Sequence, residues 1–304
     1  MNLKYIVEDK NSDRTVKHIL KNEMELSERL IKKLKYSSNI LQNSSPVFVN
    51  SKVATGDIIE VNIDFVEDCS DIEPENIPID IIYEDDYLIA LNKQPNMVVH
   101  PTCGHLSGTI ANAIVHHLNS KGISRKIRPV SRLDRDTSGV IIFAKNEYIQ
   151  ESLIRQMTSK TFKKEYLGIV HGRINEPSGT IDLPIARKPE SIMLRHVSSE
   201  GDTAITHFEV LEYFNHGTLV KFSLETGRTH QIRVHCQAIG HALIGDTLYP
   251  SLTPENDNDF SQAINRQALH SFRSSFIHPF SKNETVLVAD IPDDMNRLLE
   301  ILRK

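Results

Sequence analysis

Short apolar runs with the residue preferences of β-strands dominate residues 79–304, and they restrict the fold of this chain more than any other feature. Turn residues bound seven such runs: IDIIYED, YLIALNK, GVIIFAK, KEYLGIVHG, TAITHFEVLE, TLVKFSLE and TVLVAD. Apolar residues recur at helical spacing near 107–119, 147–158, 230–239 and 293–303. Because strands outnumber helices and do not alternate regularly with them, the pattern favours an α+β domain over a doubly wound parallel sheet. We expect a mixed, mainly antiparallel β-sheet flanked by helices.

The first 66 residues predict a small, separate α+β unit. Apolar residues recur at helical spacing after Asp13, a suitable N-cap, and a second helix with a lysine-rich face is expected from Ser27. The strand-like pieces ILQN, PVFVN and DIIEVNI follow. Two basic helices followed by a β-ribbon are suited to contact nucleic-acid phosphates. The alternative is that the lysines only solvate a helix face.

An acidic segment with two prolines, residues 67–78, predicts an extended linker between this unit and a large domain at 79–304. The net charge of the chain is −5, but nine acidic residues and no Lys or Arg lie between Glu67 and Asp86. Without that segment the remaining residues carry +4. Since binding responds to the local potential, the acidic total does not exclude RNA as a partner.

Several classes of protein are excluded or disfavoured by what the sequence lacks. No apolar run approaches the roughly 18 residues that span a bilayer, and the N-terminal residues lack the apolar core of a secretory signal. The three cysteines, Cys69, Cys103 and Cys236, are too few and too scattered for a disulfide framework. We therefore expect a cytoplasmic protein that makes no membrane contact.

The densest polar segment is Arg128–Gly139, which leads directly into the apolar run Val-Ile-Ile-Phe-Ala. A carboxylate on such a loop is held by a rigid scaffold and remains accessible. Asp134 lies between Arg132 and Arg135, and cationic neighbours stabilise the charged form that a nucleophile or general base needs. The alternative is a salt-bridge cluster at the surface. The segment also fits the D-x-D-x-T pattern of aspartate phosphatases, but there the hydrophobic strand precedes the motif, whereas here it follows.

A second polar cluster, Glu225–His235, lies at a predicted transition from strand to helix. Arg228 near the start of the helix and Arg233 within it could hold a phosphate or a carboxylate in a bidentate fork. The alternative is an isolated surface arginine. His230 and His235 are five residues apart without an intervening glutamate, so the zinc-protease pattern is not met.

Other metal and nucleotide signals are weak. His100, Cys103 and His105 are close in sequence, but no second cluster has structural-zinc spacing. Neither a P-loop nor a dinucleotide-binding glycine motif is present. We therefore expect no metal and no cofactor.

A third candidate is Tyr166, within the predicted strand Phe162–Gly172. A tyrosine in a strand usually serves packing. In an enzyme that acts on nucleic acid, it could instead stack on an extruded base.

In their order and spacing, these segments resemble the RluA family of RNA pseudouridine synthases over residues 80–290. The matching segments are Asn92–Lys93, Val98–Pro101, Arg132–Gly139 against H-R-L-D-x-x-T-S-G, Lys164–Tyr166 against K-x-Y, Thr226–His235 against T-G-R-[TS]-H-Q-[IL]-R-x-H, His241–Tyr249, and Leu269–His270. Residues 13–62 are more weakly similar to the ribosomal-protein-type RNA-binding domain that often precedes this catalytic domain. The family resemblance implies an RNA partner, an isomerase activity without cofactor or metal, and no obligate protein partner.

The same resemblance implies a role for particular residues. Asp134 corresponds to the catalytic aspartate, Tyr166 to the tyrosine that stacks on the target base, and Arg233 to the basic partner of the aspartate. The resemblance further implies a substrate-binding set, in which Leu269 forms an apolar wall: Arg132, Arg228, His230 and Leu269. The basic segments Lys121–Arg135 and Arg155–Lys164 are expected to contact the RNA backbone.

Two positions depart from the family pattern. Ser131 replaces the usual histidine before the arginine, and Asn96 stands where the K-P-x-G turn has glycine. Asparagine tolerates a positive φ better than most residues, so we expect the turn to be kept. An N-terminal RNA-binding unit favours large-subunit ribosomal RNA as substrate. The alternatives are a tRNA substrate, or a noncatalytic RNA-binding or ribosome-assembly protein on the same fold.

Overall fold

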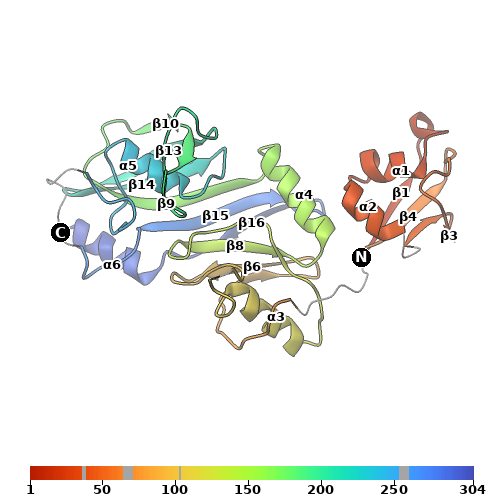
Figure 1. Ribbon diagram of the computed structural model, residues 1–304, viewed down its shortest axis with the longest axis horizontal. Helices are drawn as coiled ribbons and strands as arrows, with labels where there is room; N and C mark the ends of the chain where they lie inside the picture. Colours follow the sequence, from red (N-terminus) through yellow and green to blue (C-terminus); the bar gives the residue numbers. More distant parts are fainter. Residues whose placement is uncertain (36–38, 64–70, 103, 253–259) are drawn as a thin grey trace.

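The computed structural model describes residues 1–35, 39–63, 71–102, 104–252 and 260–304 (Figure 1). Cys69 and Cys103, and the acidic residues Glu67 and Asp68, lie outside these ranges. Beyond residue 70 the chain folds around one large sheet, in the order β10-β13-β14-β9-β15-β8-β6-β5, with β16 on β15 and β7 on β8. Its strands are β5 (Ile81–Glu84), β6 (Leu88–Lys93), β7 (Arg128–Pro129), β8 (Ser138–Ala144), β9 (Lys163–His171), β10 (Ser178–Asp182), β13 (Ile205–Tyr213), β14 (Gly217–Leu224), β15 (Leu269–Ile277) and β16 (Glu284–Val288).

The sheet is mixed and mainly antiparallel, as the sequence predicts. Its neighbouring strands run antiparallel except β15 and β8, which are parallel where His270 lies opposite Ser138. All seven predicted strands are present. The central strand β15 was missed, because its buried positions include His270, Ser271 and Ser274 instead of an apolar run.

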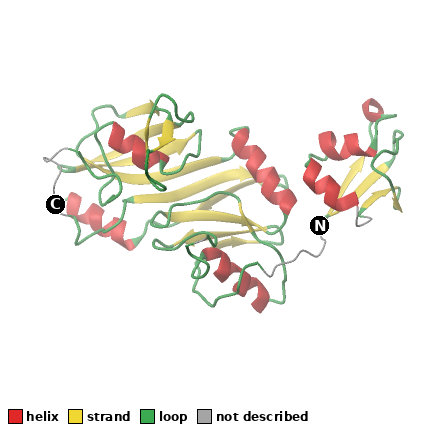
Figure 2. Ribbon diagram, in the orientation of Figure 1, coloured by secondary structure: helices red, strands yellow, loops and turns green. Residues whose placement is uncertain are grey.

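The four predicted helices of this region are present and cover the sheet (Figure 2). They are α3 (Ile110–Ser120), α4 (Glu147–Thr158), α5 (Gln231–Ala238) and α6 (Asp293–Leu302). Side chains of β8 alternate between two cores: Ile141 and Phe143 pack in a cluster with α3, and Val140 and Ile142 in a cluster with α4. Burial on both faces explains why this strand is continuously apolar.

Residues 1–63 hold a four-stranded sheet in the order β1-β4-β2-β3, covered by two helical segments. The strands are β1 (Asn2–Ile6), β2 (Ile40–Gln42), β3 (Ser45–Pro46) and β4 (Ile58–Asn62). The helices are α1 (Val16–His18), continuing as a π-helical turn η2 (Ile19–Glu23), and α2 (Glu28–Lys35), with a short 3-10 turn η1 (Asp9–Asn11) before them. A separate two-stranded ribbon, β11 (Ile185–Arg187) and β12 (Arg195–Val197), lies in the larger domain.

Two details of the N-terminal prediction were wrong. Thr15, not Asp13, caps the first helix, because its hydroxyl accepts the backbone N–H of His18 while Asp13 adopts a φ of 62°. The run PVFVN is a strand only at Pro46, and β1 was not predicted. The second helix begins where expected, since the Ser27 hydroxyl accepts the backbone N–H of Leu30.

Helix α2 contacts α4 of the larger domain. The Ser27 hydroxyl donates to Glu151 at 2.7 Å, and the nearly buried Glu147 pairs with both Arg29 and Lys33. Two of the basic residues expected to contact phosphates are therefore paired with a carboxylate. The buried apolar residues of both units form one continuous cluster.

The acidic segment also packs against the larger domain where it is described. Ile72 is buried in the α3 cluster, and Lys126 pairs with Asp71 at 2.6 Å. Burial acts to raise the pKa of Glu84, but hydrogen bonds from Lys121, His117 and Lys145 outweigh it and lower the pKa to about 2. Part of the basic segment from Lys121 is thus neutralised by the acidic one, which weakens the inference from local charge. Within the described ranges no helix has the length and apolar character to cross a membrane.

Candidate active site

Asp134 and Arg233 come together although 99 residues separate them in sequence. Asp134 lies on the loop that enters β8, and Arg233 lies in the first turns of α5. The Arg233 Nη1 group donates to Asp134 Oδ2 at 3.1 Å. The arginine side chain is 5% exposed and the aspartate 25%, so the carboxylate remains accessible beside a buried cation.

A second carboxylate fixes the orientation of Arg233. Its Nε and Nη2 groups donate to Asp246 at 2.7 and 2.8 Å, a bidentate arrangement in which the Asp246 side chain is fully buried. Burial alone would lower the pKa of Arg233, but hydrogen bonds and charges from Asp246 and Asp134 raise it above the usual value. The guanidinium therefore stays charged and directs its remaining donor at Asp134.

His230 lies on the other side of Asp134, at the N-cap of α5 with a left-handed φ of 58°. Its Nε2 is 3.9 Å from Asp134 Oδ1, and its Nδ1 is 2.8 Å from the Tyr249 hydroxyl. That hydroxyl accepts the backbone N–H of Arg195 at 2.9 Å, so its own proton is free to go to Nδ1. This pattern assigns the proton of the neutral ring to Nε2, facing Asp134. Burial lowers the pKa of His230, which favours the neutral ring.

Tyr166 projects from the central strand β9 and is 6% exposed. It shares a cluster with Leu269, Ile232 and partly buried Leu133, so the candidate apolar wall and the candidate stacking residue lie together. Burial raises the pKa of Tyr166, and the charge of Asp134 raises it further against a hydrogen bond with Ser271. The phenol therefore keeps its proton at neutral pH.

The two remaining predicted substrate residues lie on exposed parts of the site. Arg132 is exposed on the same loop as Asp134. Arg228 is exposed and binds its own surroundings, with Nε donating to Thr203 O at 3.0 Å and Nη1 3.5 Å from Asp202. The sequence neighbours of Asp134 are not its partners, since Arg135 lies against Asp136 at 3.3 Å. The arginine that pairs with Asp134 comes instead from α5.

Sequence reasoning assigned no role to the residues that support the site. Asp246, Tyr249 and Lys93 fell within matched segments but were given no role, and Arg266 was not singled out at all. Lys93 is 1% exposed and donates to three backbone carbonyls, one of them Arg135 O at 2.7 Å. Burial lowers the pKa of Lys93 to about 7. Asn96 adopts the expected positive φ, at 61°.

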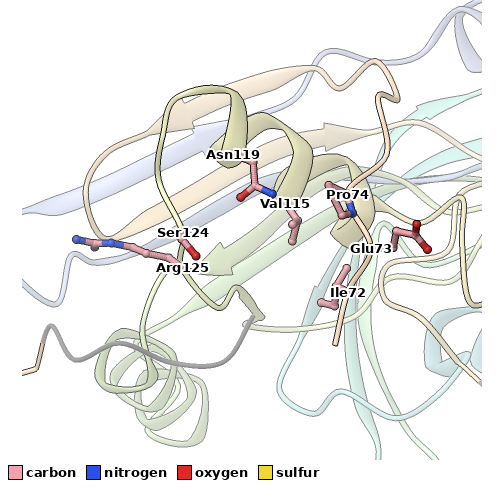
Figure 3. Close-up of a pocket in the computed structure, with 7 residues that line it drawn as sticks. All are labelled: Ile72, Glu73, Pro74, Val115, Asn119, Ser124 and Arg125. Carbon is pink, nitrogen blue, oxygen red and sulfur yellow. The ribbon is translucent and has the colours of Figure 1, made fainter. Parts of the chain in front are cut away.

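The other sites considered are a metal site, buried His235 and a cavity beside α3. No group of three or more His, Cys, Asp or Glu among the residues described could hold a metal ion. His235 is buried and bonded to Thr206 and to Leu183 O, so its role is structural. A cavity of about 510 Å³ lies beside α3, between the acidic segment and the loop after the helix (Figure 3). It is lined by Ile72, Glu73, Pro74, Val115, Asn119, Ser124 and Arg125.

The fold is similar to the solved structures of two human RNA pseudouridylate synthase domain proteins. One is human RNA pseudouridylate synthase domain containing 4, with a TM-score of 0.59 and 21% identity over 74% of this chain and 93% of that chain. Another is human RNA pseudouridylate synthase domain containing 1, with a TM-score of 0.56 and 23% identity over 76% and 98%. At these identities the likeness concerns the fold alone.

Sequence comparison extends the match to the family. Residues 87–238 match the RNA pseudouridylate synthase family. The uncharacterized RNA pseudouridine synthase YlyB of Bacillus subtilis is 40% identical over 300 residues, covering 98% of this chain and 96% of that protein. Ribosomal large subunit pseudouridine synthase D of Vibrio parahaemolyticus is 38% identical over 260 residues, covering 84% and 79%. The chain belongs to the RNA pseudouridylate synthase family. It is an isomerase that converts uridine to pseudouridine in RNA.

Proposed function

We propose that this enzyme isomerises specific uridines in large-subunit ribosomal RNA, with Asp134 as its catalytic carboxylate. The observation that supports the site is the contact between accessible Asp134 and buried Arg233. The RNA target is supported by relatives named ribosomal large subunit pseudouridine synthase D, from Vibrio parahaemolyticus and Nitrosomonas europaea, each 38% identical. The expected cytoplasmic location stays a prediction.

The reaction breaks the N1–C1′ bond of uridine, rotates the uracil and joins C5 to C1′. The proton on C5 is lost and one is gained at N1, so the net change is an isomerisation that consumes no co-reactant. A carboxylate beside the ribose is needed whether it attacks the sugar or takes its 2′-proton. Asp134 supplies that group, and Arg233 pairs with it and orients it.

Tyr166 and Leu269 would form the walls for the uracil. The target must leave its stack at a cost of a few kcal/mol, which contact with an aromatic face partly offsets. Because burial raises the pKa of Tyr166, its role is stacking and hydrogen bonding by the neutral phenol, and not removal of the C5 proton by a phenolate. His230, with Nε2–H facing Asp134, would help orient the carboxylate or a ribose hydroxyl.

Arg132 and Arg228 are exposed and would contact the RNA backbone at the mouth of the site. Residues 1–66 would extend the RNA-binding surface beyond the larger domain. Removing them should weaken RNA binding and flatten its salt dependence, since fewer phosphates are neutralised. An unchanged slope of log Kd against log salt would count against this role.

The target is tested by mapping pseudouridines in cellular RNA with and without this protein. Loss of particular pseudouridines from large-subunit ribosomal RNA, restored by the wild-type gene, is the expected result. Loss confined to tRNA would reject the ribosomal target. Retention of labelled RNA by the purified protein with no pseudouridine formed would reject catalysis.

A further inference from the structure

Arg266 connects three parts of the chain around the candidate active site. It is 6% exposed and lies just before β15. Its Nε and Nη2 groups donate to Asp294 of α6 at 2.7 and 2.9 Å. Its Nη1 group donates to Asp136 O at 2.9 Å, two residues after Asp134, and to Leu269 O at 3.3 Å. One buried guanidinium thus joins α6, the loop of Asp134 and the start of β15.

The neighbouring side chain contacts the same loop. Gln267 Nε2 donates to Thr137 Oγ1 at 3.1 Å, and both residues are buried. On the other side of the loop, Lys93 Nζ donates to Arg135 O at 2.7 Å. The carbonyls of the two residues that follow Asp134 are therefore each held by a buried basic side chain.

The backbone of this segment packs against the support of Arg233. Gly245 adopts a φ of 76°, and a Cβ there would lie 2.3 Å from Arg266 O. The Ala268 N–H donates to Ile244 O at 2.8 Å. Asp246, the residue after Gly245, holds Arg233. Residues 266–268 thus contact the loop of Asp134 through side chains and the loop of Asp246 through backbone.

We propose that Arg266, braced by Asp294, is a positioning residue that sets the geometry of the Asp134–Arg233 pair. It touches neither Asp134 nor Arg233 in any contact described, so its effect passes through the two loops. The proposal rests on the assignment of Asp134 as the catalytic carboxylate. A buried arginine suits this task because its planar fork binds Asp294 bidentately while a further N–H reaches Asp136 O.

Three variants of the full-length enzyme test the proposal: Arg266→Lys, Arg266→Gln and Asp294→Asn. Lysine keeps the charge but cannot hold Asp294 and Asp136 O together, whereas glutamine loses both charge and fork. We expect kcat per folded molecule to fall about 100-fold for Arg266→Gln, about 10-fold for Arg266→Lys, and about 5-fold for Asp294→Asn. KM for the RNA should stay within about threefold, because no RNA contact is lost.

The matched control is Arg303→Gln. Arg303 also links α6 to the sheet by a bidentate pair, with Glu212 at 3.1 and 2.7 Å. Its side chain is half exposed, and this pair involves neither the loop of Asp134 nor the loop of Asp246. We expect its kcat to equal that of wild type. Near-ultraviolet circular dichroism measures the folded fraction of each variant. At equal folded fraction, a higher kcat for Arg266→Lys than for Arg266→Gln distinguishes positioning from general stability.

The outcomes separate the inference from the function on which it rests. Wild-type enzyme that forms no pseudouridine would reject the function itself. If the wild type is active and both Arg266→Lys and Asp294→Asn have the same kcat as Arg303→Gln, the positioning role is rejected but the function is not. A fall in kcat that tracks the folded fraction would reject it as well. If Arg266→Gln does not fold, Asp294→Asn decides, since it keeps the buried guanidinium and weakens only the brace that holds it against the loop of Asp134.

Discussion

Arg233 lies 3.1 Å from Asp134 with two of its other N–H groups bound to buried Asp246. The arginine cannot turn away from Asp134 without breaking a bidentate ion pair that is almost completely buried. The accessible carboxylate of Asp134 is therefore paired with a guanidinium whose position is fixed by Asp246.

Asp246→Asn should impair both folding and catalysis. The amide can accept only part of what the carboxylate accepts, so Arg233 would lose its fixed orientation and a buried charge would lose its partner. We expect a loss of about 3 kcal/mol in the free energy of unfolding and about 30-fold in kcat, measured by denaturant titration and single-turnover assays. Glu212→Gln, which breaks the exposed Arg303 pair, should cost less than about 1 kcal/mol. Equal effects of the two variants would contradict the role of burial.

Gly139→Ala should severely destabilise the fold at the start of β8. Gly139 has a φ of 108°, and a Cβ there would lie 2.2 Å from Ser271 O on the neighbouring strand. The clash and the backbone strain together should cost about 4 kcal/mol or prevent folding. Gly227→Ala is the control, because it has ordinary φ and open space around it. A Gly139→Ala protein within about 1 kcal/mol of wild type would show that the two strands are not so close.

His270 should make the enzyme sensitive to acid. Burial lowers its pKa to about 4, with the charge of Arg266 acting in the same direction. His270 is therefore protonated below about pH 6.5 in the unfolded chain but only below about pH 4 in the folded chain. The stability from this group is fully present above pH 6.5 and is lost as the pH falls to 4, by about 3 kcal/mol in all.

The measurement is the free energy of unfolding between pH 7 and 4, for wild type and for His270→Asn. The difference between the two proteins should change by most of that amount over the interval. Parallel curves would mean that His270 titrates normally in the folded protein.

Glu147→Gln should loosen the contact between α2 and α4. Its side chain is 5% exposed and pairs with Arg29 and Lys33, so the neutral amide leaves two cations poorly matched. We expect faster amide hydrogen exchange in α2 and in the first turns of α4. Glu28→Gln serves as control, because Glu28 pairs with Lys17 and Lys21 inside the N-terminal unit. Indistinguishable exchange in the two variants would contradict the proposed contact.

Much of the fold could be predicted because uninterrupted apolar runs in the sequence indicate buried strands. β8 is buried on both faces and reads as GVIIFA, and α4 begins where Asn146 caps it. The strand β15 could not be predicted in this way, because its buried positions include His270 and Ser271, whose polar groups are satisfied by contacts that only the folded chain provides.

The candidate site likewise includes some residues that the sequence identified and others that it did not. The motif resemblance identified Asp134, Tyr166 and Arg233 as a group, and the structure brings them together. Sequence order placed Asp134 between Arg132 and Arg135, but the arginine that pairs with it in the structure is Arg233 on α5. Asp246 and Arg266 act through bidentate pairs whose partners lie 13 and 28 residues away in sequence, and no local pattern signals such pairs.

Pseudouridine formation by Asp134→Asn tests the central claim most directly. The substitution keeps the size of the side chain and removes its charge, while Arg233 remains held by Asp246. We expect a rate at least about 1,000-fold below wild type on the same transcript, with RNA affinity within about threefold because no phosphate contact changes. Asp136→Asn on the same loop, whose carboxylate lies against Arg135, should stay within about tenfold of wild type. Normal turnover by Asp134→Asn would contradict the assignment of Asp134 as the catalytic carboxylate.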